Sequence, residues 1–317
     1  MFSVTDTSEN DFKKLILEDT GTGTRAELIP ACGAALHAFS VLQHGLRLNL
    51  IDHYTNAGEF KEELTQNFKS SKLSPFVCRL MNGSYSFGGS LYKTGKFYNG
   101  RHALHGLLYD AVFLESSRHA DEKGASVIMK HEYRKNDAGY PFNYDCIVTY
   151  ELSAVNKLCI STEIINRDDG LIPVGDGWHP YFRFGKTIDE LQLEFQSTAV
   201  LEFDEDLLPT GLSLPYEEFT SLKKIGDTSF DNCFVLDLTE CQPLCVLRDP
   251  AQKIQVEIQP DTAYPYLQIY TPPHRKSIAI ENLSSAPDAF NNGIGLRTLF
   301  PGAAARFTTT YRIRSLP

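Results

Sequence analysis

Four polar residues, Arg79, His105, His179 and Glu281, interrupt apolar or turn-rich stretches of the sequence. Arg79 lies between apolar neighbours, where a guanidinium is costly to bury without a partner or a ligand. Gly106 follows His105 and indicates a tight backbone beside a close-fitting site. Glu281 ends the apolar run 278–280 and could project from the end of a buried strand. These three residues also fit ordinary roles, as an exposed strand arginine, a turn histidine and a strand-end glutamate.

The fourth residue stands in the most informative cluster, Trp178-His179-Pro180-Tyr181-Phe182. The proline restricts the backbone, and the aromatic residues supply flat apolar surfaces. Such a loop suits recognition of a sugar ring, whose C–H face packs on aromatic rings while its hydroxyls need polar partners. A histidine held there could also act as a general acid or base. The same residues would equally fit an aromatic core that contains one hydrogen-bonded histidine.

Asp231 is a fifth candidate, although the pair Asp231-Asn232 by itself favours a turn. Other catalytic patterns are missing: the sequence has no G-x-S-x-G nucleophile motif and no histidine pair at zinc-binding spacing on a helix. The seven cysteines are an odd number without a C-x-x-C pair, so neither a disulfide framework nor a cysteine-based metal site is supported. Reduced cysteines of this kind favour a cytoplasmic location.

The elements that must position these residues are mostly strands. Alternating apolar and polar residues predict strands in the segments 127–132, 147–152, 158–164, 191–196, 254–258, 266–270 and 307–313. Turn-forming residues separate them, for example at 166–170 and 208–211. Only 8–15 and 59–68 are modest helix candidates. Without βαβ alternation, a phosphate loop or an internal repeat, the sequence predicts an all-β chain, with residues 1–317 forming one domain that is a large antiparallel sandwich.

The composition narrows the classes of partner. The 317 residues include 40 acidic and 30 basic ones, a net charge of −10. This charge argues against nucleic acid, whose phosphates need a concentrated positive surface, and against an anionic membrane. No apolar run is long enough to cross a bilayer, and the first twenty residues do not resemble a signal peptide. Most of the 15 Tyr and 20 Phe residues are expected to fill a sheet-based core.

Taken in order, these segments resemble the aldose 1-epimerase (galactose mutarotase) superfamily over nearly the whole chain. Residues 104–106 resemble the family's L-H-G motif, and residues 179–182 resemble its H-x-Y-F motif. The other resembling segments are the first hairpin at 26–30 and 33–36, the sugar-binding Arg79 strand with Asn82 and Gly83, the P-T-G turn at 208–211, Asp231 before a short strand, and the tail 280–302.

The resemblance implies a β-supersandwich fold and interconversion of the α and β anomers of a free aldose. This is an isomerase reaction of hexose metabolism that requires no cofactor and no metal. It implies that Glu281 is the general base at the C1 hydroxyl and that His179 is the general acid at the ring oxygen. The ring would open, rotate about C1–C2 and close from the other face. The implied partner is a small-molecule sugar, and the chain is expected to be a monomer or weak homodimer. The implied sugar-binding residues are Arg79, His105, Asp231 and Tyr181.

The sequence departs from the family pattern at three positions beside these motifs. Trp178 and Arg183 stand where close members have Asn, and Leu107 stands where they have a second Gly. The chain therefore resembles a divergent member, and two alternatives stay open. One is a hexose-6-phosphate epimerase, for which Arg101 and Arg183 could supply phosphate-binding cations. The other is a non-catalytic carbohydrate-binding protein of the same fold.

Overall fold

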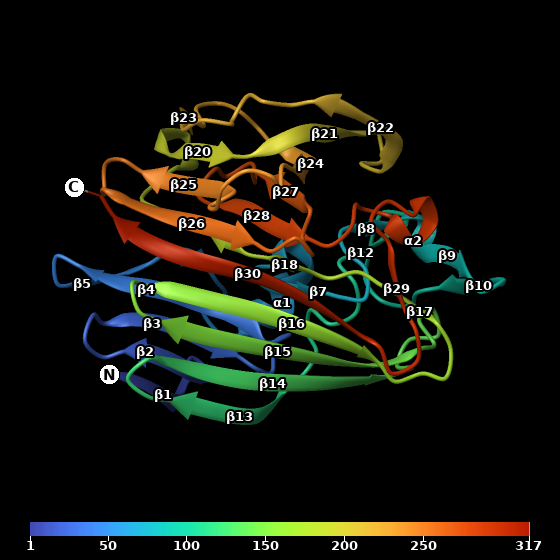
Figure 1. Ribbon diagram of the computed structural model, residues 1–317, viewed down its shortest axis with the longest axis horizontal. Helices are drawn as coiled ribbons and strands as arrows, with labels where there is room; N and C mark the ends of the chain where they lie inside the picture. The colour runs from blue at the N-terminus through green and yellow to red at the C-terminus, as the bar shows by residue number, and fades with distance from the viewer. Residues whose placement is uncertain (317) are drawn as a thin grey trace.

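The computed structural model describes residues 1–316 and consists mainly of antiparallel β-sheets, as the sequence predicts (Figure 1). In spatial order, the first nine-stranded sheet contains β13 (Leu114–Ala120), β14 (Gly124–Arg134), β15 (Asn143–Ser153), β16 (Lys157–Asn166), β30 (Ala304–Ser315), β26 (Ile254–Pro260), β25 (Cys245–Asp249), β20 (Gln192–Phe195) and β23 (Lys223–Lys224). The second contains β22 (Pro209–Pro215), β21 (Ser197–Phe203), β24 (Asp231–Leu236), β27 (Tyr266–Tyr270), β28 (Ile278–Leu283), β18 (Gly177–His179) and β7 (Ser71–Leu73), with β19 (Tyr181–Phe182) joining β28 to β6 (Ile51–Asp52).

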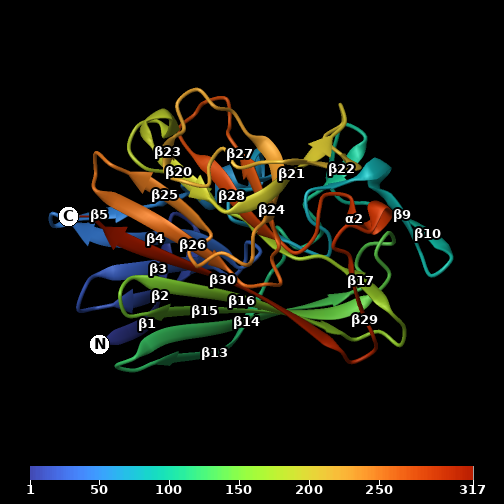
Figure 2. The same ribbon diagram turned by 45° about the horizontal axis from the view of Figure 1, so that its top comes forward.

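A five-stranded sheet completes the large layers. It contains β1 (Phe2–Glu9), β2 (Phe12–Asp19), β3 (Thr24–Ile29), β4 (Ala35–Gln43) and β5 (Leu46–Asn49). Its first strands pack against β14 and β15, and Figures 1 and 2 show them behind those strands. The smaller sheets are β11 (Tyr98–Asn99) with β12 (His102–Leu104) and β8 (Arg79–Leu80), β9 (Ser84–Phe87) with β10 (Ser90–Lys93), and β17 (Ile172–Val174) with β29 (Arg297–Leu299).

All seven predicted strand segments coincide with strands of the structure, namely β14, β15, β16, β20, β26, β27 and β30. The segment 208–211 differs from its prediction as a turn. The chain turns just before it, where the Asp204 N–H donates a hydrogen bond to the Leu208 carbonyl, and Pro209 already begins β22. The alternation of buried and exposed side chains predicted the strands well because most of them have one face against the core.

One of the two predicted helices is present. The segment 59–68 corresponds to α1 (Ala57–Asn67), which Asn56 caps by accepting a hydrogen bond from the Glu59 N–H at 2.9 Å. The helical prediction for 8–15 is wrong. Asn10 and Asp11 have φ of 51° and 63°, and they form the two-residue turn of the β1–β2 hairpin, which pairs Glu9 with Phe12. A second, short helix, α2 (Ala289–Asn292), follows β28.

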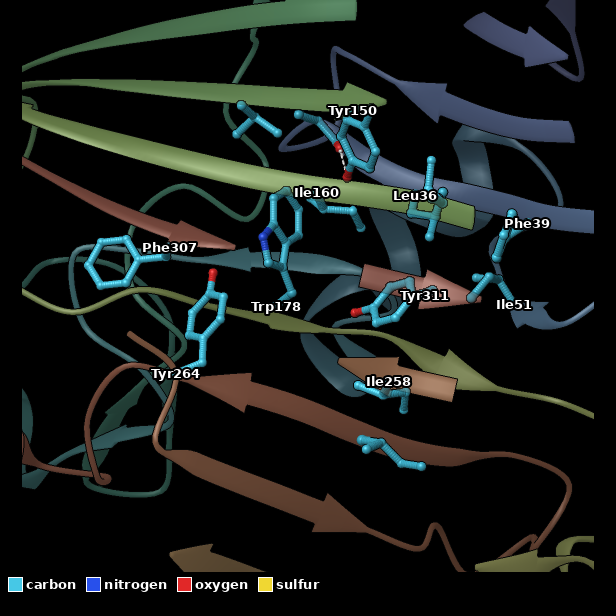
Figure 3. Packing of buried hydrophobic residues seen from close by; sticks show 14 of the residues in the cluster. Leu36, Phe39, Ile51, Tyr150, Ile160, Trp178, Ile258, Tyr264, Phe307 and Tyr311 are labelled. Carbon is cyan, nitrogen blue, oxygen red and sulfur yellow. Dashed lines mark hydrogen bonds between the residues drawn. The ribbon is translucent and has the colours of Figure 1, made fainter. Parts of the chain in front are cut away.

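The main core is a large cluster of buried apolar side chains drawn from all three large sheets, and two smaller apolar clusters accompany it. Figure 3 shows Trp178 pointing into this core toward Tyr150. The centroids of the two rings lie 6.1 Å apart. The Tyr150 hydroxyl donates a hydrogen bond to the Ala34 carbonyl at 2.8 Å, which satisfies its buried polar end. All seven cysteines are free thiols, and five of them are buried. Among residues 1–316, no helix combines the length and apolar character needed to span a membrane.

Candidate active site

The second nine-stranded sheet gathers the predicted residues on one face because side chains alternate along each strand. Tyr181 on β19 pairs with Ala279 on β28. The same antiparallel register, continued from β19 to β18, places His179 opposite Glu281. On the other side of β28, Gln268 of β27 pairs directly with Glu281. A row of three polar side chains therefore crosses the sheet.

His179 and Glu281 form the centre of this row. His179 Nε2 lies 3.3 Å from Glu281 Oε1, and both side chains are buried. Burial raises the pKa of the Glu281 carboxyl well above its usual value, since a charge is poorly solvated there. Burial also lowers the pKa of His179 to about 4. These surroundings favour a neutral carboxylic acid beside a neutral imidazole, so the pair keeps one proton that either group could carry.

His105 lies against His179 at a strained turn of the backbone. Its φ is 61°, and its ring meets the His179 ring edge-on at a centroid distance of 4.9 Å. Phe68, at the end of α1, covers the other part of the ring at 4.6 Å. The predicted tight backbone is present, since a Cβ on Gly106 would lie 2.4 Å from the Ser74 carbonyl oxygen. Burial lowers the pKa of His105 well below its usual value, which favours a neutral ring.

Arg79 and Asp231 supply opposite charges to the same space. Arg79 begins β8 and is half-buried, and Asp231 begins β24 rather than lying in a turn. Asp231 Oδ1 accepts a hydrogen bond from Gln268 Nε2 at 3.0 Å. Burial raises the pKa of Asp231, while the attraction of the Arg79 guanidinium opposes that rise. A ligand between them would meet a donor on one side and an acceptor on the other.

The aromatic residues beside His179 divide between the pocket and the core. Tyr181 lines the pocket, with its ring 5.0 Å from the His179 ring. Trp178 and Phe182 belong instead to the core cluster, so they do not form a sugar-stacking surface as the sequence suggested. The period-2 alternation of a strand is the reason, because residues on either side of His179 and Tyr181 must face the opposite way.

These side chains enclose a cavity of about 180 Å³. All six predicted site residues line it: Arg79, His105, His179, Tyr181, Asp231 and Glu281. Neither Arg101 nor Arg183 lines it, and Arg101 forms an ion pair with Asp206 at the surface. Sequence reasoning missed Gln268 and Tyr270, although both occupy alternate positions of the recognised strand 266–270 and could have been marked as facing Glu281. It also missed Asn99, Cys78 and the α1 residues 65–67.

A second polar cluster lies on the core side of β18. Lys72 Nζ lies 2.6 Å from Asp176 Oδ2, and both side chains are fully buried. The Tyr264 hydroxyl also donates to Asp176, at 2.6 Å, and Lys72 Nζ donates to Thr162 Oγ1 at 3.0 Å. Lys72 pairs with Trp178 across β7 and β18, and its Nζ lies 4.4 Å from the centre of the Trp178 ring system. This cluster fixes the strand that ends at His179.

Comparison with known proteins agrees with this architecture. The chain is 30% identical over 256 residues to the uncharacterized protein YihR of Escherichia coli, covering 77% of this chain and 79% of that protein. Its fold matches a galactose mutarotase-like protein from Clostridium acetobutylicum, with a TM-score of 0.86, 17% identity and 99% of each chain covered. It also matches galactose 1-epimerase from Lactobacillus acidophilus, with a TM-score of 0.81, 20% identity, and 100% and 99% of the two chains covered.

These matches show that the predicted supersandwich, the galactose mutarotase-like fold, is the fold of this chain. The model of the aldose 1-epimerase family covers residues 15–312, which is nearly the whole sequence and includes every residue of the pocket described above. The chain therefore belongs to the aldose 1-epimerase family.

Proposed function

We propose that this protein is an isomerase that interconverts the α and β anomers of a free aldose. The observation that carries the proposal is the facing pair of Glu281 and His179, 3.3 Å apart in a buried pocket lined by further polar groups. Anomer exchange needs one group that takes a proton from the C1 hydroxyl and another that gives a proton to the ring oxygen. A carboxyl and an imidazole that share one proton can perform both tasks.

The proton count of the proposed reaction balances within the pair. The sugar would meet Glu281 as a carboxylate and His179 as an imidazolium, which together hold as many protons as the neutral pair. Ring opening moves the C1 hydroxyl proton to Glu281 and the His179 proton to the ring oxygen. The open-chain aldehyde then rotates about its C1–C2 bond. During closure His179 takes back the proton of the attacking hydroxyl, and Glu281 protonates the carbonyl oxygen.

The burial of the pair supports this sequence of events. Burial raises the pKa of Glu281 and lowers that of His179, so the neutral pair is favoured when the aldehyde is present. The charged pair requires the hydroxyls of the ring sugar to complete its hydrogen bonds. We assign sugar binding to Arg79, His105, Asp231 and Tyr181, which line the pocket around the pair. These contacts would hold C1 and the ring oxygen against the reacting groups.

A neutral aldose is the substrate class we favour. Arg79 is the one lysine or arginine among the pocket-lining residues of the described chain, and its charge is already opposed by that of Asp231. A hexose 6-phosphate would bring a dianion without a cation cluster to receive it. Two relatives carry names that fit aldoses: maltose epimerase of Levilactobacillus brevis, 21% identical, and galactose 1-epimerase of Lactobacillus acidophilus, 20% identical. A single domain, a cytoplasmic location and a monomer or weak homodimer remain part of the proposal.

Polarimetry on freshly dissolved α-glucose and α-galactose tests the function. We expect the protein to accelerate equilibration of a neutral sugar, and to act less well on glucose 6-phosphate at low and high salt alike. Glu281→Gln should reduce turnover at least about 100-fold, since general acid–base groups contribute about 10²–10⁴-fold. Glu163→Gln, on the strand β16 outside the pocket, is the matched control and should keep full activity. If the wild-type protein binds sugar without accelerating equilibration, it is a carbohydrate-binding protein instead.

A further inference from the structure

The pocket also contains a group of three possible metal-ligand atoms, and the proposed reaction does not require these three to act together. The Cys78 sulfur, an imidazole nitrogen of His105 and a carboxylate oxygen of Glu281 all lie within 4.8 Å of one another. All three residues are buried, and all three line the pocket. Cys78 has no role in the proposed proton transfers, and its thiol is free.

The backbone holds two of these residues side by side. Leu104 of β12 pairs with Arg79 of β8, and the same register continued by one residue sets His105 opposite Cys78. The His105 N–H donates a hydrogen bond to the Cys78 carbonyl at 2.8 Å. Both residues have a left-handed backbone, with φ of 61° and 48°, which is uncommon for residues with a side chain. The backbone therefore holds the two residues next to each other before any ligand arrives, and their side chains can still rotate.

Two polar atoms of this set lack partners. His105 Nδ1 and Glu281 Oε2 are buried and form no hydrogen bond among residues 1–316. The two residues are 8% and 1% exposed, so bulk water does not satisfy these atoms. A buried polar atom without a partner is costly, at about 1–3 kcal/mol, and marks a place where a ligand can be bound.

We propose that Cys78, His105 and Glu281 bind a zinc ion in this pocket, and that the bound ion excludes the sugar. Sulfur, nitrogen and oxygen donors from three residues, with a fourth position open to the pocket, are the ligand set of an open tetrahedral zinc site. Mg²⁺ and Ca²⁺ prefer oxygen ligands only, so a thiol and an imidazole select against them. In a tetrahedral site with zinc–ligand bonds of about 2.0–2.3 Å, the donor atoms lie about 3.3–3.8 Å from one another. Donor atoms that lie within 4.8 Å of one another can reach this spacing by small side-chain rotations.

The binding step balances as a proton exchange. The Cys78 thiol and a protonated Glu281 each lose a proton to solvent, and the zinc ion gains two anionic ligands and the neutral His105. No electron moves. With Glu281 and His105 engaged by the ion, neither could contact a sugar hydroxyl, so zinc and sugar would compete for one place. The inhibitory consequence rests on the proposed function, whereas metal binding itself does not.

Cobalt substitution tests the site directly. Titration with Co²⁺ should produce a near-ultraviolet charge-transfer band from a Co–thiolate bond, and Zn²⁺ should remove that band by displacement. Cys78→Ser should abolish the band and weaken zinc binding in calorimetry at least about 10-fold. Cys241→Ser removes the exposed cysteine, the thiol most open to adventitious metal, and should leave both measurements unchanged. Circular dichroism of both variants verifies that they are folded.

Three results would overturn the proposal: no band in the wild-type protein, a band that persists in Cys78→Ser, or a band that disappears in Cys241→Ser. A sugar titration then tests whether metal and sugar exclude each other. An aldose should displace the bound Co²⁺ and remove the band, whereas a sugar that binds and leaves the band unchanged would contradict the proposed competition. In the polarimetric assay Zn²⁺ should raise the apparent KM without changing kcat. The Cys78→Ser protein should need a zinc concentration at least about 10-fold higher for the same increase in KM. A failure of catalysis alone refutes the proposed function but leaves the metal-binding result intact.

Discussion

Lys72 and Asp176 form a fully buried ion pair, 2.6 Å between Nζ and Oδ2, directly behind the strand that ends at His179. Lys72 comes from β7, and Asp176 immediately precedes β18. The pair is held between Thr162 of the first nine-stranded sheet and Tyr264. It therefore ties the layer that carries His179 and Glu281 to the opposite layer of the sandwich, on the side that faces away from the pocket.

Removing one partner of this pair should destabilise the protein strongly. Asp176→Asn leaves the Lys72 ammonium buried without a counter-charge, and we expect a loss of about 3–5 kcal/mol in the free energy of unfolding, measured with urea. The exposed pair of Lys224 and Glu190 is the control, with Nζ and Oε2 2.8 Å apart. Glu190→Gln should change stability by less than about 1 kcal/mol. Equal effects of the two substitutions would show that the buried Lys72–Asp176 pair contributes no more to the free energy of unfolding than an exposed pair.

Substitutions of Trp178 and Tyr181 should have opposite effects on stability and activity, although only two residues separate these positions. Trp178 is in the core and outside the pocket, so Trp178→Ala should cost about 3–5 kcal/mol of stability. Tyr181 lines the pocket, so Tyr181→Phe should keep the stability and weaken kcat/KM for the sugar. Urea unfolding and polarimetry on both variants measure the contrast. An unchanged kcat/KM in Tyr181→Phe would show that the Tyr181 hydroxyl does not take part in sugar binding.

The sequence permitted good prediction of the strands, and all six residues predicted for the site line one pocket. A strand with one buried face has alternating apolar and polar residues in its sequence, as β16 does. The six residues were predicted for the site from short motifs such as residues 179–182. The facing of His179 and Glu281 could not be derived, because it depends on the register between β18 and β28, strands far apart in the chain. The hairpin at Asn10 and Asp11 was misread as helical because its positive φ angles were not inferred.

Gly106 should be irreplaceable because of space as well as conformation. Its φ is 75°, and a Cβ there would come within 2.4 Å of the Ser74 carbonyl oxygen. Gly100 has a similar φ of 61°, but a Cβ there would meet no atom within 4 Å. Both substitutions to Ala carry the strain of a left-handed backbone, about 1–2 kcal/mol. Gly106→Ala should cost at least about 2 kcal/mol more than Gly100→Ala, and it should also lower activity by displacing His105. Similar losses in the two variants would refute the close approach.

His37 on β4 should make the fold sensitive to acid. Its side chain is buried, with its ring 5.5 Å from the Phe12 ring and 4.4 Å from the His53 ring. Burial, and then the nearby His53 and Lys14, lower the pKa of His37 from 6.5 to about 3. Between these two values the unfolded chain binds a proton that the folded protein does not. The stability that neutral His37 contributes is therefore complete above about pH 6.5 and is lost progressively as the pH falls toward 3.

Urea unfolding at pH 7 and pH 4.5 measures this contribution. Over that range one such histidine accounts for about 2–3 kcal/mol, since each unit of pKa difference corresponds to about 1.4 kcal/mol. His37→Gln cannot take up the proton, so its free energy of unfolding should fall by that much less than in the wild-type protein. His44→Gln, at an exposed turn, should follow the wild-type pH dependence. His105 and His179 share the direction of shift and remain in every variant, so they cancel from the comparison. An unchanged pH dependence in His37→Gln would mean that this histidine is already solvated or charged in the folded protein.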